Sequence, residues 1–270
     1  LYVYNYVCIN TYRMNSMAKV ITVINQKGGV GKTTTAHAVG AWLQLKRHQK
    51  VLFLDLDQQG NLTYSLDASH SDYDALEVLK TGKLDVSKIQ NTAAGYHILP
   101  SSPALANIDS VLNQVGKEYR LKEALTGLES YDYVVMDTPP SLNIITINAL
   151  TASDFALIPA QADIFSLQGI TQLAQTIDVV KRYTNTNLNI LGVVLTKHNT
   201  RSVLGRDLQQ VITDTVTHIH TKVYTHFIRE AVAVREAQAM KKDIFSYDGK
   251  SNPAKAYDLF MQEVWKDIRP

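Results

Sequence analysis

The stretch Asn25-Gln26-Lys27-Gly28-Gly29-Val30-Gly31-Lys32-Thr33-Thr34-Thr35 decides the fold of this chain. It follows an apolar, β-branched run at 20–24, which predicts a buried strand, and it precedes a helical pattern at 36–45. A glycine-rich loop between a strand and a helix is the setting of a phosphate-binding P-loop. The strict spacing G-x-x-x-x-G-K-[ST] fails at its first position, where Gln26 stands in place of glycine. An additional lysine, Lys27, precedes the glycines.

This loop carries groups that bind the phosphates of a nucleotide. Its glycines let backbone N–H groups turn inward around an anion, and the following helix adds unpaired amide donors and the positive end of its dipole. In a P-loop, Lys32 reaches the β- and γ-phosphates and the Thr33 hydroxyl coordinates Mg²⁺. The alternative is a flexible glycine turn without a ligand, which the flanking strand and helix disfavour. We predict phosphate contacts from Gly28, Gly29, Val30, Gly31, Lys32, Thr33 and Thr34.

Two later strands are predicted to end in carboxylates. The apolar run 51–54 is followed by Asp55 and Asp57. The run 131–136 is followed by Asp137 and the sequence Thr-Pro-Pro-Ser. In an open parallel sheet these strand ends line the ligand crevice. Asp137 is therefore predicted to be a Walker B residue that binds Mg²⁺ directly or through water. The alternative for each aspartate is to cap a turn.

The order of the predicted elements indicates the fold class. Strands alternate with helices along the chain, which predicts an α/β fold with a doubly wound, mainly parallel sheet flanked by helices, as in P-loop NTPases. With 270 residues, 45% of them hydrophobic, the chain can bury one sizeable core. We expect a single ATPase domain at 17–270. Residues 1–16 form a tyrosine-rich leader, interpreted as an artefact, an alternative N-terminus or a short edge strand. Further strands are predicted at 96–100, 155–159 and 188–196, and helices at 74–79, 104–128, 166–183, 202–217 and 253–267.

The loop with its additional lysine resembles the deviant Walker A motif of the ParA/MinD family of P-loop ATPases. In that family the additional lysine reaches across a dimer to the partner's nucleotide, a role that the resemblance assigns to Lys27. The stretch 55–61 resembles the family's switch I, usually D-x-D-P-Q-G-N, with Gln58 in place of proline. The resemblance assigns the positioning of the attacking water to Asp57. Lys27, Lys32 and Asp57 are thus the predicted catalytic residues; for Lys27 the alternative is an ordinary solvated lysine.

The resemblance also implies residues outside the loop. The segment from Thr196 and the loop around Ile228 correspond to parts of the family that lie near the adenine. Arg201 and Arg229 correspond to arginines that contact DNA phosphates in partition ATPases. Residues 1–196 carry 15 Lys and Arg against 16 Asp and Glu, whereas the remainder carries 12 against 9. This positive excess near the C-terminus is compatible with DNA binding or with a solvated face.

Composition excludes several classes of protein. The single cysteine rules out an intrachain disulfide and a metal cluster held by this subunit's thiolates, as in nitrogenase-type iron proteins. No apolar run is long enough to span a membrane. The helix predicted at 253–267 balances its basic and acidic residues, so we expect it to pack on the protein's own sheet and not on a membrane surface. The expected location is the cytoplasm, in association with the nucleoid.

The resemblance implies a ParA-type partition ATPase that uses ATP and Mg²⁺ and converts ATP and water to ADP and phosphate. Its ATP-bound homodimer would bind double-stranded DNA without sequence preference. A ParB-like centromere-binding partner would stimulate hydrolysis and release, moving a plasmid or a chromosomal origin. Three alternatives remain open: a MinD-like membrane-cycling ATPase, a P-loop small-molecule kinase or ligase, and a DNA-binding protein with a vestigial nucleotide site.

Overall fold

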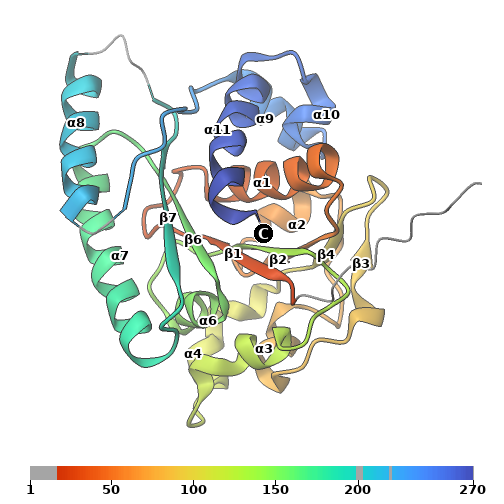
Figure 1. Cartoon of the computed structure of the whole chain (residues 1–270). Helices are drawn as coiled ribbons and strands as arrows, with labels where there is room; N and C mark the ends of the chain where they lie inside the picture. Colours follow the sequence, from red (N-terminus) through yellow and green to blue (C-terminus); the bar gives the residue numbers. More distant parts are fainter. Residues whose placement is uncertain (1–16, 199–202, 219–220, 270) are drawn as a thin grey trace, which may run out of the picture.

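A seven-stranded sheet forms the centre of the described part of the chain (Figure 1). The computed structural model describes residues 17–198, 203–218 and 221–269. The strand order is β3-β4-β2-β5-β1-β6-β7, and each neighbouring pair is parallel except β3 with β4. The strands are β1 (Lys19–Val23), β2 (Val51–Asp55), β3 (Gln90–Asn91), β4 (His97–Leu99), β5 (Tyr133–Asp137), β6 (Phe155–Ala160) and β7 (Asn189–Leu195).

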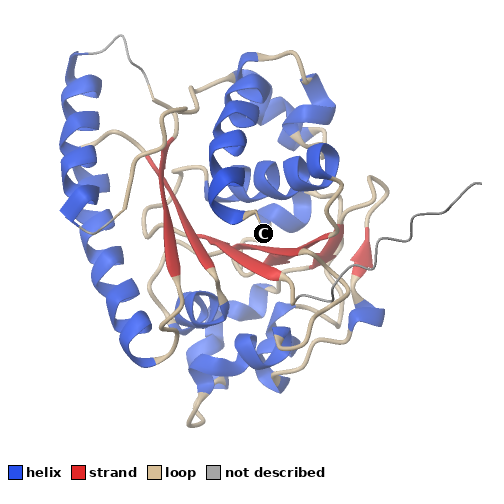
Figure 2. Ribbon diagram, in the orientation of Figure 1, coloured by secondary structure: helices blue, strands red, loops and turns tan. Residues whose placement is uncertain are grey.

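Helices cover both faces of this sheet (Figure 2). Every residue of β2 and of β5 is buried, as expected for parallel strands with a layer of helices on each side. The predicted doubly wound α/β fold is therefore confirmed. The helices are α1 (Lys32–Arg47), α2 (Asn61–Ser65), α3 (Ala75–Thr81), α4 (Ile108–Val111), α5 (Arg120–Leu125), α6 (Ile144–Ala152), α7 (Ile164–Tyr183), α8 (Val203–His218), α9 (Val232–Ala239), α10 (Ile244–Asp248) and α11 (Asn252–Ile268).

The helices divide into three groups. In Figure 1, α1, α9, α10 and α11 lie above the sheet, α3, α4 and α6 lie below it, and α7 and α8 lie beside β6 and β7. The C-terminal helix α11 packs into the first of these layers, as predicted from its balanced charge. Its inward apolar side chains are each at most 1% exposed: Tyr257, Phe260, Met261, Val264 and Ile268.

Close packing of α1 on the sheet depends on one glycine. A Cβ atom at Gly40 would lie 2.1 Å from Cζ of Phe53 on β2. No side chain fits at that separation, so the absence of a Cβ allows the helix to approach the strand. Because α1 begins at the P-loop, this contact also fixes the direction of the helix dipole at the site.

The structure corrects one expectation and contains elements that were not predicted. The helix predicted over 104–128 is divided into α4, α5 and two 3₁₀ turns, because Gly116 adopts a φ of 80° that a continuous helix excludes. Strand β3 and helices α2, α6, α9 and α10 were not predicted. Helix α6 follows its N-cap residue Asn143, whose side chain accepts hydrogen bonds from the N–H groups of Ile145 and Thr146. Its residues are apolar on nearly all sides, so they show no helical periodicity.

Candidate nucleotide-binding site

The site is built at the carboxyl ends of three adjacent strands. Strand β1 leads into the glycine loop, and the register pairs Asp55 at the end of β2 with Asp137 at the end of β5. Helix α1 follows Gly31, which adopts a φ of 83°. Among the described residues, no side chain accepts a hydrogen bond at the N-terminal end of α1, and the first turn of this helix contains no acidic residue. The first amide N–H groups of α1 therefore remain available to an anion.

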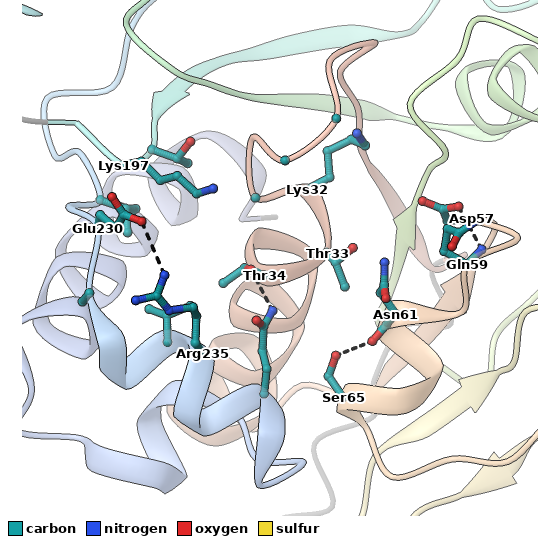
Figure 3. A pocket seen from close by; sticks show the side chains of 18 of the residues that line it. Lys32, Thr33, Thr34, Asp57, Gln59, Asn61, Ser65, Lys197, Glu230 and Arg235 are labelled. Atoms are coloured by element: carbon teal, nitrogen blue, oxygen red, sulfur yellow. Dashed lines mark hydrogen bonds and ion pairs between the residues drawn. The ribbon is translucent and has the colours of Figure 1, made fainter.

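A cavity of about 600 Å³ lies against the loop (Figure 3). One wall is the P-loop and the start of α1, and a second is formed by Asp57 and α2. The third wall combines the segment after β7, residues 228–231 and α9. The predicted residues that line the cavity are Gly28, Gly29, Gly31, Lys32, Thr33, Thr34, Asp57, Thr196, Ile228 and Arg229.

Lys32 is held with its amine near the loop and the acidic strand ends. Its Nζ donates to the carbonyl oxygen of Lys27 at 3.0 Å. Burial lowers the pKa of the Lys32 ammonium, whereas the carboxylates of Asp137 and Asp57 oppose this effect. A cation in this position can neutralise part of the charge of a bound triphosphate.

Thr33 and Asp137 supply a pair of oxygen atoms suited to Mg²⁺. The Thr33 hydroxyl donates to Oδ2 of Asp137 at 2.6 Å. Oδ1 of Asp137 is buried without a hydrogen-bond partner among the described residues. Burial raises the pKa of Asp137 well above its ordinary value, and the nearby Asp55 carboxylate acts in the same direction. A bound divalent cation would compensate this buried charge.

The chemistry of this pair fits Mg²⁺. No group of three or more His, Cys, Asp or Glu side chains suited to a metal occurs in the described part of the chain. Mg²⁺ is usually held by one or two protein oxygens together with water and substrate phosphates, so two protein ligands suffice. When bound, the ion neutralises charge that develops on the β- and γ-phosphates. Thr33 and Asp137 are the residues that would hold it.

The two aspartates after β2 have different surroundings. Oδ2 of Asp55 accepts the N–H and the hydroxyl of Thr63, each at 2.7 Å. Burial raises the pKa of Asp55 to about 6, although these hydrogen bonds oppose the shift. Asp55 therefore fills the capping role considered as an alternative for the pair. Asp57 lines the cavity, and its Oδ1 accepts the N–H of Gln59 at 3.1 Å.

Lys27 points away from the cavity. Its ammonium forms an ion pair with Asp163, the residue that caps α7. Lys27 is absent from the described residues that line the cavity. Burial works against ionisation of Asp163, yet hydrogen bonds from Lys27 and Ser166 bring its pKa below the ordinary value. In this conformation Lys27 therefore neutralises a carboxylate of its own subunit.

The residues predicted near the adenine lie side by side. Thr196 and Ile228 form an isolated parallel bridge, and both line the cavity. The Thr196 hydroxyl donates to the carbonyl of Val30 in the P-loop at 2.7 Å. Arg229 is exposed and lines the same cavity. Arg201, the other predicted DNA contact, lies outside the described residues.

Sequence reasoning missed the contribution of α9 and of the segment after β7. Lys197, Arg235 and Gln238 line the cavity (Figure 3 labels the first two). No motif marks these positions. Gln238 contacts Thr34 in the phosphate-binding segment, 204 residues earlier in the chain. One backbone signal accompanies them: Lys197 adopts a φ of 50°, an uncommon conformation for a residue with a side chain.

Comparisons with known proteins agree with this geometry. A family model described as an AAA domain matches residues 18–190. The sporulation initiation inhibitor protein Soj of Bacillus subtilis is 39% identical over 255 residues, which cover 92% of this chain and 98% of Soj. The chromosome partitioning protein ParA of Caulobacter vibrioides is 37% identical over 257 residues, covering 91% and 93% of the two chains. The chain belongs to the ParA-type partition ATPases.

A solved structure similar to this ParA-type chain contains nucleotide and metal. It is the cobyrinic acid a,c-diamide synthase from Mycobacterium smegmatis with bound ATP analog and magnesium. That chain is 33% identical, with a TM-score of 0.77, and the match covers 94% of this chain and 98% of that one. The P-loop NTPase fold is thereby confirmed. This ParA-type protein is an ATPase whose cofactors are ATP and Mg²⁺.

Proposed function

We propose that this ATPase partitions DNA by means of an ATP-dependent homodimer. The dimer binds double-stranded DNA without sequence preference, and a ParB-like partner stimulates hydrolysis and release. The observation that carries this proposal is a shared cavity. Lys197, Arg229 and Arg235 line the same cavity as the P-loop. Cations that can bind DNA phosphates are therefore contiguous with the site whose occupancy changes during the ATPase cycle.

We assign the catalytic steps to three residues. Lys32 binds the β- and γ-phosphates, and Asp57 orients the attacking water. Lys27 leaves Asp163 and approaches the nucleotide of the partner subunit, where it stabilises charge on the transferred phosphoryl group. Supplying this cation from the second subunit makes hydrolysis depend on the dimer. The adenine lies beside Thr196 and Ile228 in this proposal.

The membrane-cycling alternative finds less support. Among the described residues, no helix is both long and apolar enough to cross a bilayer. The terminal helix α11 has its main apolar side packed inside the protein, with Phe260 and Val264 fully buried. That side is not available to insert into a lipid surface.

A small-molecule ligase is the second candidate, because the similar structure from Mycobacterium smegmatis carries the name of a synthase. Such an enzyme would hydrolyse ATP only when an acceptor metabolite is present. Turnover that depends on a cobyrinic acid substrate and ignores DNA would favour it over the partition proposal.

A salt titration of DNA binding tests the proposal. Affinity for duplex DNA is measured with ATP, with ADP and without nucleotide, on two unrelated sequences. We expect binding only with ATP, equal affinity for both sequences, and a log–log salt slope of about −0.9 per phosphate neutralised. Equal affinity in all three nucleotide states would exclude ATP gating. An absence of binding even at low salt would refute the DNA assignment.

Arg229→Ala tests the predicted phosphate contact. The slope should become shallower by about 1 for each phosphate that the arginine no longer neutralises, with no change in sequence preference. Because Arg229 lines the cavity, ATP affinity is measured on the same variant to separate the two effects. Arg182→Ala removes an exposed arginine at the end of α7, away from the cavity, and serves as the matched control. If both variants change the slope equally, Arg229 makes no specific contact.

A further inference from the structure

A hydrogen bond joins α9 to the first turn of α1. Nε2 of Gln238 donates to Oγ1 of Thr34 at 2.9 Å. Both residues line the nucleotide cavity, and both are partly buried. Figure 3 shows this hydrogen bond as the dashed line that ends on Thr34. A residue distant in the sequence thus contacts a side chain of the phosphate-binding segment.

The surroundings of Thr34 determine the direction of its hydroxyl proton. A hydroxyl has one proton to donate and two lone pairs that accept. The amide of Gln238 occupies one lone pair. A threonine within a helix commonly donates to the carbonyl four residues earlier. Here that carbonyl belongs to Val30, which accepts the hydroxyl of Thr196. Within the described part of the chain, the Thr34 side chain has no hydrogen bond other than the one from Gln238, so its proton can be donated into the cavity.

We infer that Gln238 is a positioning residue for nucleotide binding. It fixes the Thr34 hydroxyl so that the proton is donated to a phosphate oxygen of bound ATP or ADP. A hydrogen bond to a charged acceptor is stronger than one between neutral groups, so its correct orientation contributes directly to affinity. This inference rests on the binding of nucleotide to the P-loop and is independent of dimerisation and DNA binding.

The C-terminal end of α9 contacts the segment after α2. Just beyond α9, Lys241 forms an ion pair with Asp67, which follows α2, at 2.6 Å. Both residues of this pair adopt the left-handed backbone region, with φ values of 53° and 56°. Because the side chains of Lys241 and Asp67 are 41% and 51% exposed, this ion pair is a weak link between the end of α9 and the segment after α2.

Two variants of Gln238 test the inference through nucleotide affinity alone. Gln238→Glu keeps the shape but replaces the amide by a carboxylate, which only accepts and adds a negative charge. The Thr34 proton then turns toward the carboxylate, and the Kd for Mg-ATP should rise at least about tenfold. Gln238→Ala releases the hydroxyl without a new charge and should raise Kd about threefold to tenfold. Gln175→Glu, an exposed position on α7, makes the same change of charge outside the cavity and should leave Kd unchanged.

A double-mutant cycle separates positioning from a general structural role. Thr34→Val removes the hydroxyl, so adding Gln238→Ala to it should change Kd by less than about twofold. If the factors by which the two changes raise Kd multiply in the double variant, the changes act independently and the inference is wrong. An unchanged Kd in Gln238→Ala or in Gln238→Glu would also overturn it. The melting temperature of the nucleotide-free protein is measured for each variant. If affinity falls only in proportion to lost stability, Gln238 is structural and the inference is wrong.

Discussion

The ion pair between Lys27 and Asp163 should oppose dimerisation. If Lys27 acts on the partner's nucleotide, its contact with Asp163 must break in each subunit when the dimer closes. Asp163→Asn removes the carboxylate charge but retains a good helix cap, because asparagine caps helices about as well as aspartate. The cap itself is a hydrogen bond from the N–H of Ser166 to Asp163 at 2.9 Å. The variant therefore isolates the charge of the pair.

The size of the effect follows from the exposure of the pair. The side chains of Lys27 and Asp163 are 28% and 31% exposed. Water screens such a pair, which places its contribution at about 0.5–1 kcal/mol. Two pairs break for each dimer, so the total is about 1–2 kcal/mol, and the dimer of Asp163→Asn should be about 5- to 30-fold tighter.

Sedimentation equilibrium with a non-hydrolysable ATP analogue measures this change. The gain should shrink at high salt, because screening already weakens the pair in the wild-type protein. Asp178→Asn makes the same charge change at an exposed position of α7 and serves as the control. An unchanged or weaker dimer in Asp163→Asn would refute the reasoning and would indicate that Asp163 holds Lys27 in a productive position.

Two further changes test the site and its surroundings. Asp57→Ala should retain ATP binding but lose most partner-stimulated phosphate release, because no carboxylate then orients the water; release at the wild-type rate would assign this role elsewhere. Burial lowers the pKa of His37 from 6.5 to about 4, against the effect of Asp243. Between these two values the unfolded chain binds an extra proton at His37, so this group alone lowers the free energy of unfolding by about 3 kcal/mol as the pH falls, whereas the raised pKa of Asp55 acts in the opposite direction. In urea titrations the wild-type protein should therefore lose about 3 kcal/mol more than His37→Leu over this pH range; the same pH dependence in both proteins would refute the assignment.

The local sequence determined the strands other than β3, the P-loop and the acidic strand ends. Each of these features has a short-range cause. β-Branched runs favour a strand, and the glycines of 28–31 leave backbone amides free to face an anion. The alternation of elements then limits the fold to a doubly wound sheet, because parallel strands require crossover helices. The break within 104–128 and helix α6 were not predicted, since neither shows a clear period or boundary.

Only the tertiary structure decided which side chains meet. Asp55 and Asp57 both follow the same strand, and only the resemblance to switch I distinguished them; in the structure Thr63 engages Asp55, while Asp57 lines the cavity. Contacts between residues far apart in the sequence depend on the order of the strands in the sheet. That order is set by how the sheet and its helices bury their apolar faces together, and no local signal in the sequence specifies it. The contacts of Lys27 with Asp163 and of Thr34 with Gln238 span 136 and 204 residues. For this reason the sequence located the phosphate-binding loop, whereas the fold alone supplied the residues that hold and orient its side chains.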